Sequence, residues 1–125
     1  MERTYRQHLR QEDLTHFQVV VRQTDLLIGV RRDRFTPALA REVERYVQEL
    51  RRGLESYIAT DPAFLHAMEP HPLRSGAPPV AADMAAAALA GVGPMAAVAG
   101  AIADRVGRFL ARYSRDVFVE NGGDL

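Results

Sequence analysis

A long amphipathic pattern between residues 37 and 59 sets the strongest limit on the fold. Thr36 and Pro37 open it, because a threonine hydroxyl can cap free amides and proline suits the first helical position. Apolar residues then recur three or four apart along one helical stripe: Leu39, Val43, Tyr46, Val47, Leu50, Leu54, Tyr57 and Ile58. Charged residues occupy the other side. The pattern predicts a surface helix that covers a sheet.

Strand patterns occur at both ends of the chain. Residues 14–21 are rich in β-branched and aromatic residues with period two, and residues 26–30 form a second apolar run, so a hairpin with a turn at 23–25 is expected. The charged stretch 3–9 suits an edge strand. Residues 116–120 form a last strand. These elements predict an α+β fold with an antiparallel sheet and helices packed against it, within a single domain spanning residues 1–125.

The middle of the chain contains shorter helical signals. Asp61 and Pro62 repeat the cap-plus-proline pattern, so a helix over 63–68 with Asp61 as its cap is expected. Five helix-breaking residues then predict an irregular crossing: Pro70, Pro72, Gly76, Pro78 and Pro79. Further helices are expected over 80–90 and 94–113.

Composition excludes several classes of protein. The chain has 16 basic residues, all of them arginine, 16 acidic residues and no cysteine, so cysteine catalysis and thiolate metal sites are excluded and a nucleic-acid partner is not expected. Residues 84–103 carry no charge, but half are alanine and Pro94 divides them, which favours two closely packed helices over a membrane span. With no apolar segment at the start, a cytoplasmic location is expected.

The first candidate site is the glycine-containing run from Gly91 to Gly100. Gly91 and Gly93 precede Pro94 and Met95 at a helix start, where bare amides and the helix dipole attract phosphate. This is neither a dinucleotide fingerprint nor a P-loop, since no strand precedes it and no lysine is present. The alternative is that these glycines only allow helices to turn and to approach closely.

The second candidate is the segment Asn121, Gly122, Gly123 and Asp124. Its glycines allow a ligand to lie against the backbone, and its amide and carboxylate suit hydroxyl, ring-nitrogen or metal contacts. The alternative is a hairpin turn whose partner strand comes from another chain or from a longer polypeptide. Two weaker signals are a metal site at His66 and His71, and a basic loop at Arg31, Arg32 and Arg34.

Four segments in one order carry a resemblance to a known family. They are residues 24–28 (TDLLI), residues 57–64 (YIATDPAF), residues 91–103 (GVGPMAAVAGAIA) and residues 119–124 (VENGGD). Over essentially the whole chain the sequence resembles the N-terminal half of an uncharacterised bacterial and archaeal family in the ApbE-like superfamily. The best-known members of that superfamily are FAD:protein FMN transferases.

The resemblance implies an ApbE-like fold of about twice this length and a flavin nucleotide, FAD or FMN, with Mg²⁺ at the diphosphate. It places Gly91, Gly93 and Gly100 beside the diphosphate and residues 121–124 beside the nucleotide. The transferases usually have a lysine where Ala99 stands here, and catalysis by these 125 residues alone is not expected. Two hypotheses follow: a flavin-nucleotide protein that could act as a transferase when complete, or a non-catalytic, homo-oligomeric assembly module completed by another chain.

Overall fold

The computed structural model describes residues 2–4, 13–88 and 93–122, with backbone alone for residues 2–4. The chain divides into two compact units, the first formed by residues 1–47 and 103–125 and the second by residues 48–102. The predicted single domain therefore contains two clusters of contacts, and each is described by itself. The long helix α1 (Pro37–Thr60) and the helix α4 (Val98–Leu110) each contribute residues to both units.

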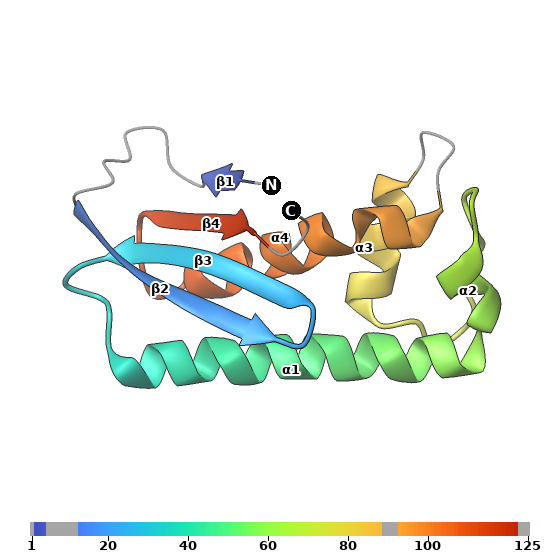
Figure 1. Ribbon diagram of the computed structural model, residues 1–125, viewed down its shortest axis with the longest axis horizontal. Coiled ribbons are helices and arrows are strands. Elements are labelled where there is room, and N and C mark those ends of the chain that lie inside the picture. The colour runs from blue at the N-terminus through green and yellow to red at the C-terminus, as the bar shows by residue number, and fades with distance from the viewer. Residues whose placement is uncertain (1, 5–12, 89–92, 123–125) are drawn as a thin grey trace. The chain divides into compact units, whose positions relative to one another are not determined.

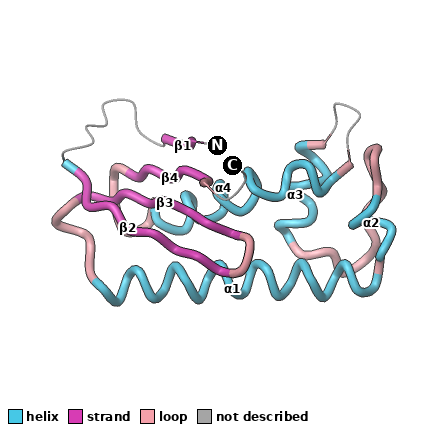
Figure 2. The backbone as a smooth tube through the Cα atoms, in the orientation of Figure 1, coloured by secondary structure: helices cyan, strands magenta, loops and turns pink. Residues whose placement is uncertain are grey.

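The first unit contains a four-stranded antiparallel sheet with the strand order β1-β4-β3-β2 (Figures 1 and 2). The strands are β1 (Glu2–Thr4), β2 (Leu14–Val21), β3 (Thr24–Arg31) and β4 (Val117–Asn121). The predicted α+β class and the antiparallel sheet built from both ends of the chain are confirmed. The expected edge position holds for β1, while the rest of the stretch 3–9 lies outside the described residues.

The β2–β3 hairpin is tighter than its sequence indicated. Its loop is Arg22 and Gln23, because Val21 pairs directly with Thr24 and the ladder runs from there to Leu14 and Arg31. The expected turn at 23–25 was therefore wrong, although threonine and aspartate favour turns. Arg22 has a φ of 54°, the left-handed backbone that a two-residue hairpin loop demands. The ladder gains two residue pairs, and their hydrogen bonding offsets the energetic cost of a backbone conformation that arginine rarely adopts.

One face of the sheet forms the core of the first unit. Leu26, Ile28 and Val30 are 0% exposed, and the register of β3 with β4 places Val119 and Val117 beside the last two of them on the same face. Buried side chains of the first half of α1 and the end of α4 complete this core: Leu39, Val43, Val47, Val106 and Leu110. The helical stripe is thus confirmed, but only residues 37–47 share a unit with the sheet.

The second unit contains the end of α1, α2 (Pro62–His66), α3 (Pro79–Ala87), the short 3₁₀ helix η2 (Pro94–Ala97) and the start of α4. The helix expected over 63–68 ends at His66 because Ala67 is extended, with a ψ of 131°. The helix expected over 80–90 is α3, and residues 89–92 lie outside the described part. The single helix expected over 94–113 is instead η2 followed by α4, which ends at Leu110.

Ser114 explains why α4 ends before residue 113. Its hydroxyl donates to the carbonyl of Asp116 at 2.8 Å and accepts the amide of Arg31 at 3.0 Å, which anchors the chain to β3 ahead of β4. Among the described residues, no helix combines the length and apolar character needed to span a membrane.

Candidate functional site

Gly93 lies against the backbone of the segment that follows α2. A Cβ atom at this position would overlap the carbonyl oxygen and carbon of Ala67. Gly93 is buried in an extended conformation, and its carbonyl accepts the amide of Ala96 at 3.2 Å as η2 begins. Close packing against Ala67 therefore accounts for the lack of a side chain at residue 93. Gly91 lies outside the described residues.

The rest of the glycine run forms a continuous helical start. Pro94 is buried, while Met95 and Gly100 are half-buried, and η2 leads into α4 at Val98 without a break. Pro94 has no amide hydrogen, and the Ala96 amide donates to the Gly93 carbonyl, so among the first three residues of η2 only the Met95 amide is left as a donor for an anion.

The second candidate segment begins inside the sheet. Asn121 is the last residue of β4, pairs with Leu26 and is 6% exposed, so it is not the first residue of a turn as expected. The amide of Gly122 donates to the carbonyl of Asp25 at 3.0 Å, and a Cβ at Gly122 would meet nothing within 4 Å. Because β4 pairs with β3, it extends to Asn121, one residue beyond the end that the apolar pattern predicted. Gly123 and Asp124 lie outside the described residues.

The two candidate segments belong to different units. Gly93, Pro94, Met95 and Gly100 are part of the second unit, whereas Asn121 and Gly122 belong to the first. Each remains a candidate ligand contact on its own.

A polar cluster that sequence reasoning missed is centred on Asp61 in the second unit. The Asp61 side chain is 1% exposed and makes no capping hydrogen bond to α2, which corrects the expectation that it caps this helix. Its carboxylate instead accepts the hydroxyl of Tyr57 at 3.3 Å and lies 3.1 and 3.2 Å from Nε2 of His71. Arg74 adds charge compensation, with its Nε 3.8 Å from the carboxylate.

The same cluster attaches the proline-rich crossing to α1. The amide of Arg74 donates to the Tyr57 hydroxyl at 2.8 Å, and its guanidinium donates to the carbonyl of Thr60 at 3.0 Å. Phe64 is 0% exposed and contacts the rings of both Tyr57 and His71 edge to face. The spacing of Tyr57 and Asp61 places them one helical turn apart, but no sequence pattern links them to residues 71 and 74.

The weak metal signal at His66 and His71 gains no further ligands from the part of the chain that the structure describes. Among the described residues, no group of three or more histidine, aspartate or glutamate side chains is placed to hold a metal ion. His66 is exposed at the end of α2, whereas His71 is engaged with Asp61.

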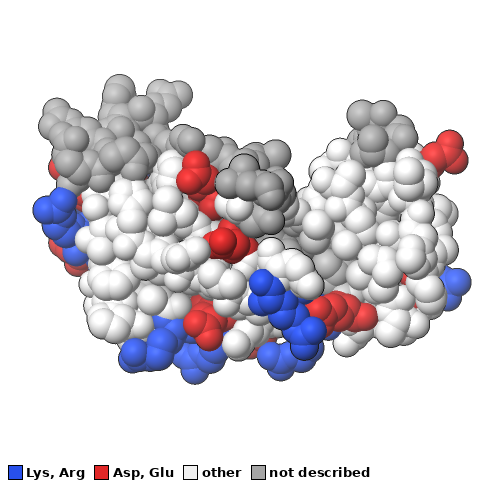
Figure 3. All heavy atoms as spheres, in the orientation of Figure 1, with Lys and Arg blue, Asp and Glu red and all other residues white. Residues whose placement is uncertain are grey.

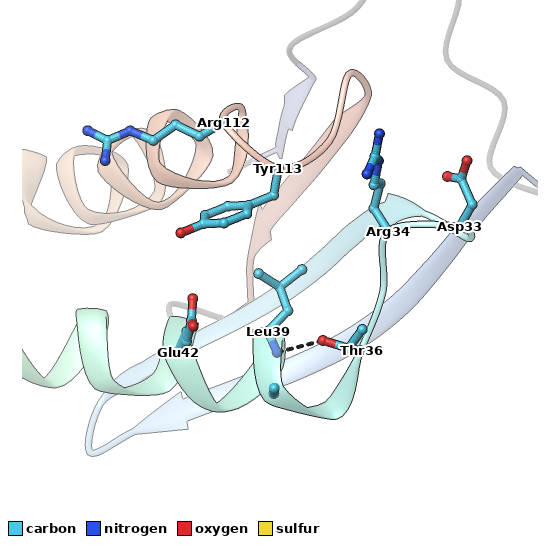
Figure 4. Close-up of a pocket in the computed structure, with 8 residues that line it drawn as sticks. Asp33, Arg34, Thr36, Leu39, Glu42, Arg112 and Tyr113 are labelled. Carbon is cyan, nitrogen blue, oxygen red and sulfur yellow. Dashed lines mark hydrogen bonds between the residues drawn. The ribbon is translucent and has the colours of Figure 1, made fainter.

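The basic loop after β3 is partly neutralised. Arg31 is paired with Asp116 at 3.2 Å and with Asp33 at 3.4 Å, and the hydrogen bond that its guanidinium donates to Asp116 is the largest cause of its raised pKa. A cavity of about 460 Å³ adjoins this loop and is lined by side chains of both charges, with Arg34 and Arg112 projecting in different directions (Figure 4). Acidic and basic side chains are likewise interspersed on the face shown in Figure 3.

Comparison with known proteins identifies the family and the relatives to which this sequence is similar. The sequence model of a family described as "AbpE bacteria" matches residues 6–125. A UPF0280 protein from Methanopyrus kandleri is 44% identical over 109 residues, covering 86% of this chain and 42% of the relative. A UPF0280 protein from Methanocaldococcus jannaschii is 33% identical over 108 residues, with 86% and 42% covered. One from Methanosphaerula palustris is 48% identical over 77 residues, with 60% and 32% covered. The chain thus spans about two fifths of the length of the first two relatives.

Proposed function

The chain belongs to the family described as "AbpE bacteria", and from this premise we propose that it forms part of a flavin-nucleotide binding protein. The observation that carries the proposal is the extent of the match, residues 6–125, which includes both glycine-containing segments. FAD or FMN is the ligand that resemblance to the ApbE-like superfamily implies, with Mg²⁺ at its phosphates. The complete protein, at the length of its relatives, is the species expected to bind it.

Each segment on its own is a candidate contact for the nucleotide. The helical start over 94–100 supplies the Met95 amide and a helix dipole that favour phosphate, while Gly93 packs this start against Ala67. Gly122 leaves open space where a side chain would stand, so a ring or ribose could approach the backbone beyond β4. The carboxylate of Asp124 would add a contact to a hydroxyl or to Mg²⁺.

A specific observation favours a second candidate function, a non-catalytic assembly module. The packing of Gly93 on Ala67 explains that glycine without a ligand, and β2 has no neighbouring strand on its outer side among the described strands. An uncharged eight-residue strand at an edge is a template for pairing with another chain. Under this alternative the protein is a stable homo-oligomer that binds no nucleotide.

Titration of the complete protein with FAD and FMN, with and without Mg²⁺, separates the two functions. Flavin fluorescence should change on binding, and Asn121→Ala and Asp124→Ala should each weaken that binding. Gln48→Ala is the control for a substitution outside both segments, because it removes an exposed amide from α1 in the second unit. Absence of binding, or binding indifferent to both site variants, contradicts the nucleotide proposal. A stable oligomer in analytical ultracentrifugation together with no binding would favour the assembly module.

A further inference from the structure

The geometry points to a proton-accepting site at His71, organised by the buried carboxylate of Asp61. Its ligand would be a hydroxyl group, of water or of an alcohol, placed at Nδ1 of the imidazole. This site is made of residues outside the two glycine-containing segments and does not depend on a flavin.

The carboxylate determines which ring nitrogen carries the proton. An ionised carboxylate only accepts hydrogen bonds, and both oxygens of Asp61 lie within 3.2 Å of Nε2 of His71. The Tyr57 hydroxyl already accepts the amide of Arg74, so its own proton is directed at the same carboxylate. We therefore assign the proton of the neutral imidazole to Nε2, which leaves the lone pair on Nδ1.

The ring is held rigidly on its other sides while Nδ1 stays available. Phe64 packs edge to face against the imidazole with the ring centroids 6.2 Å apart, which fixes the plane of the ring. The His71 side chain is 24% exposed, and within the described residues Nδ1 has no hydrogen-bond partner. A carboxylate that orients an imidazole and compensates the imidazolium is the arrangement by which proteins make histidine an effective base.

The alternative is a purely structural clamp, in which the cluster only holds the proline-rich crossing against α1. This role accounts for less of the geometry. The contacts of Arg74 with Tyr57 and Thr60 already attach the crossing to α1. Burying Asp61 beside an imidazole adds the desolvation of a carboxylate, which the hydrogen bonds from Tyr57 and His71 and the nearby Arg74 guanidinium offset. A purely structural role also requires no exposure of the imidazole, whose side chain is 24% exposed.

Nitrogen-15 NMR of the histidine rings in this chain tests the tautomer directly. Neutral His71 is expected to carry its proton on Nε2. A proton on Nδ1 would overturn the inference, because the lone pair would then face Asp61. In Asp61→Asn, an amide N–H beside Nε2 should raise the population of the opposite tautomer.

Hydrolysis of p-nitrophenyl acetate by the same chain tests proton acceptance. Nδ1 takes a proton from water as the water oxygen bonds to the acyl carbon, and p-nitrophenolate leaves. His71→Gln keeps an N–H for Asp61 and should lower the rate above buffer several-fold, as should Asp61→Asn. His66→Gln is the matched control, since it removes an exposed imidazole from the same unit and should change the rate little. Equal rates for wild type and folded His71→Gln would overturn the inference.

Discussion

Gly93 and Ala67 meet backbone to backbone in the second unit, with the carbonyl of Ala67 in the space that a side chain at residue 93 would need. Gly93→Ala must therefore shift one of the two backbones. We expect it to reduce the free energy of unfolding by about 1–3 kcal/mol, as overpacking does in other cores. Urea unfolding followed by circular dichroism measures the change.

Gly53→Ala is the control for this effect. A Cβ there would meet only the Pro78 side chain at 3.8 Å, and residue 53 is inside α1, where alanine is favoured over glycine by about 0.5–1 kcal/mol. We expect this variant to be as stable as wild type or more so. A Gly93→Ala protein with wild-type stability would show that the backbone at the contact with Ala67 shifts at little energetic cost.

Asp61→Ala removes the centre of the polar cluster. Tyr57 and His71 each lose their carboxylate acceptor, and Tyr57 is 4% exposed, so its hydroxyl is left without that partner in a buried setting. We expect a loss of about 1–3 kcal/mol in the free energy of unfolding. Thermal melts of the variant and wild type provide the comparison.

The matched substitution is Glu55→Ala, whose exposed carboxylate pairs with Arg51 at 3.3 Å one turn away on α1. Such a pair contributes at most about 0.5 kcal/mol on a helix surface. Similar losses in both variants would mean that burial of Asp61 adds nothing to its contribution to the free energy of unfolding.

Ser114→Ala disconnects two strands that are distant in sequence. The amide of Arg31 loses its acceptor and the carbonyl of Asp116 loses a donor. Both bonds are made by the hydroxyl of Ser114, which is 4% exposed. We expect destabilisation of about 1–3 kcal/mol and faster amide hydrogen exchange at Arg31. Ser75→Ala, at an exposed position, should change neither quantity.

Thr36→Ala tests the start of α1. The Thr36 hydroxyl accepts the amide of Leu39 at 3.0 Å, which is the N-terminal cap anticipated from the sequence. Removing it should cost about 1 kcal/mol, and Thr36→Ser should retain most of the stability because serine offers the same oxygen. Equal losses for alanine and serine would assign the effect to the threonine methyl instead.

Local patterns identified the elements whose stability is local. The bounds of β2 and the start and near-complete length of α1 followed from period-two and helical spacing together with a cap. Errors occurred where pairing overrode local preference: Thr24 and Asp25 pair with Val21 and Val20 across a two-residue hairpin loop, and Ser114 bonds to the distant Arg31 just beyond the early end of α4. The candidate site was affected in the same way, since strand pairing absorbed Asn121.

The amino-acid sequence by itself determined the class of fold, the long helix and membership of the family, because residue spacing and motif order are properties of the chain alone. Only the tertiary structure decided what Asp61 and Gly93 do. A cap-plus-proline signal cannot show that a carboxylate turns away from its own helix toward a histidine ten residues later. A glycine's reason for having no side chain is likewise visible only when the backbone that occupies the space, here at Ala67, is brought beside it.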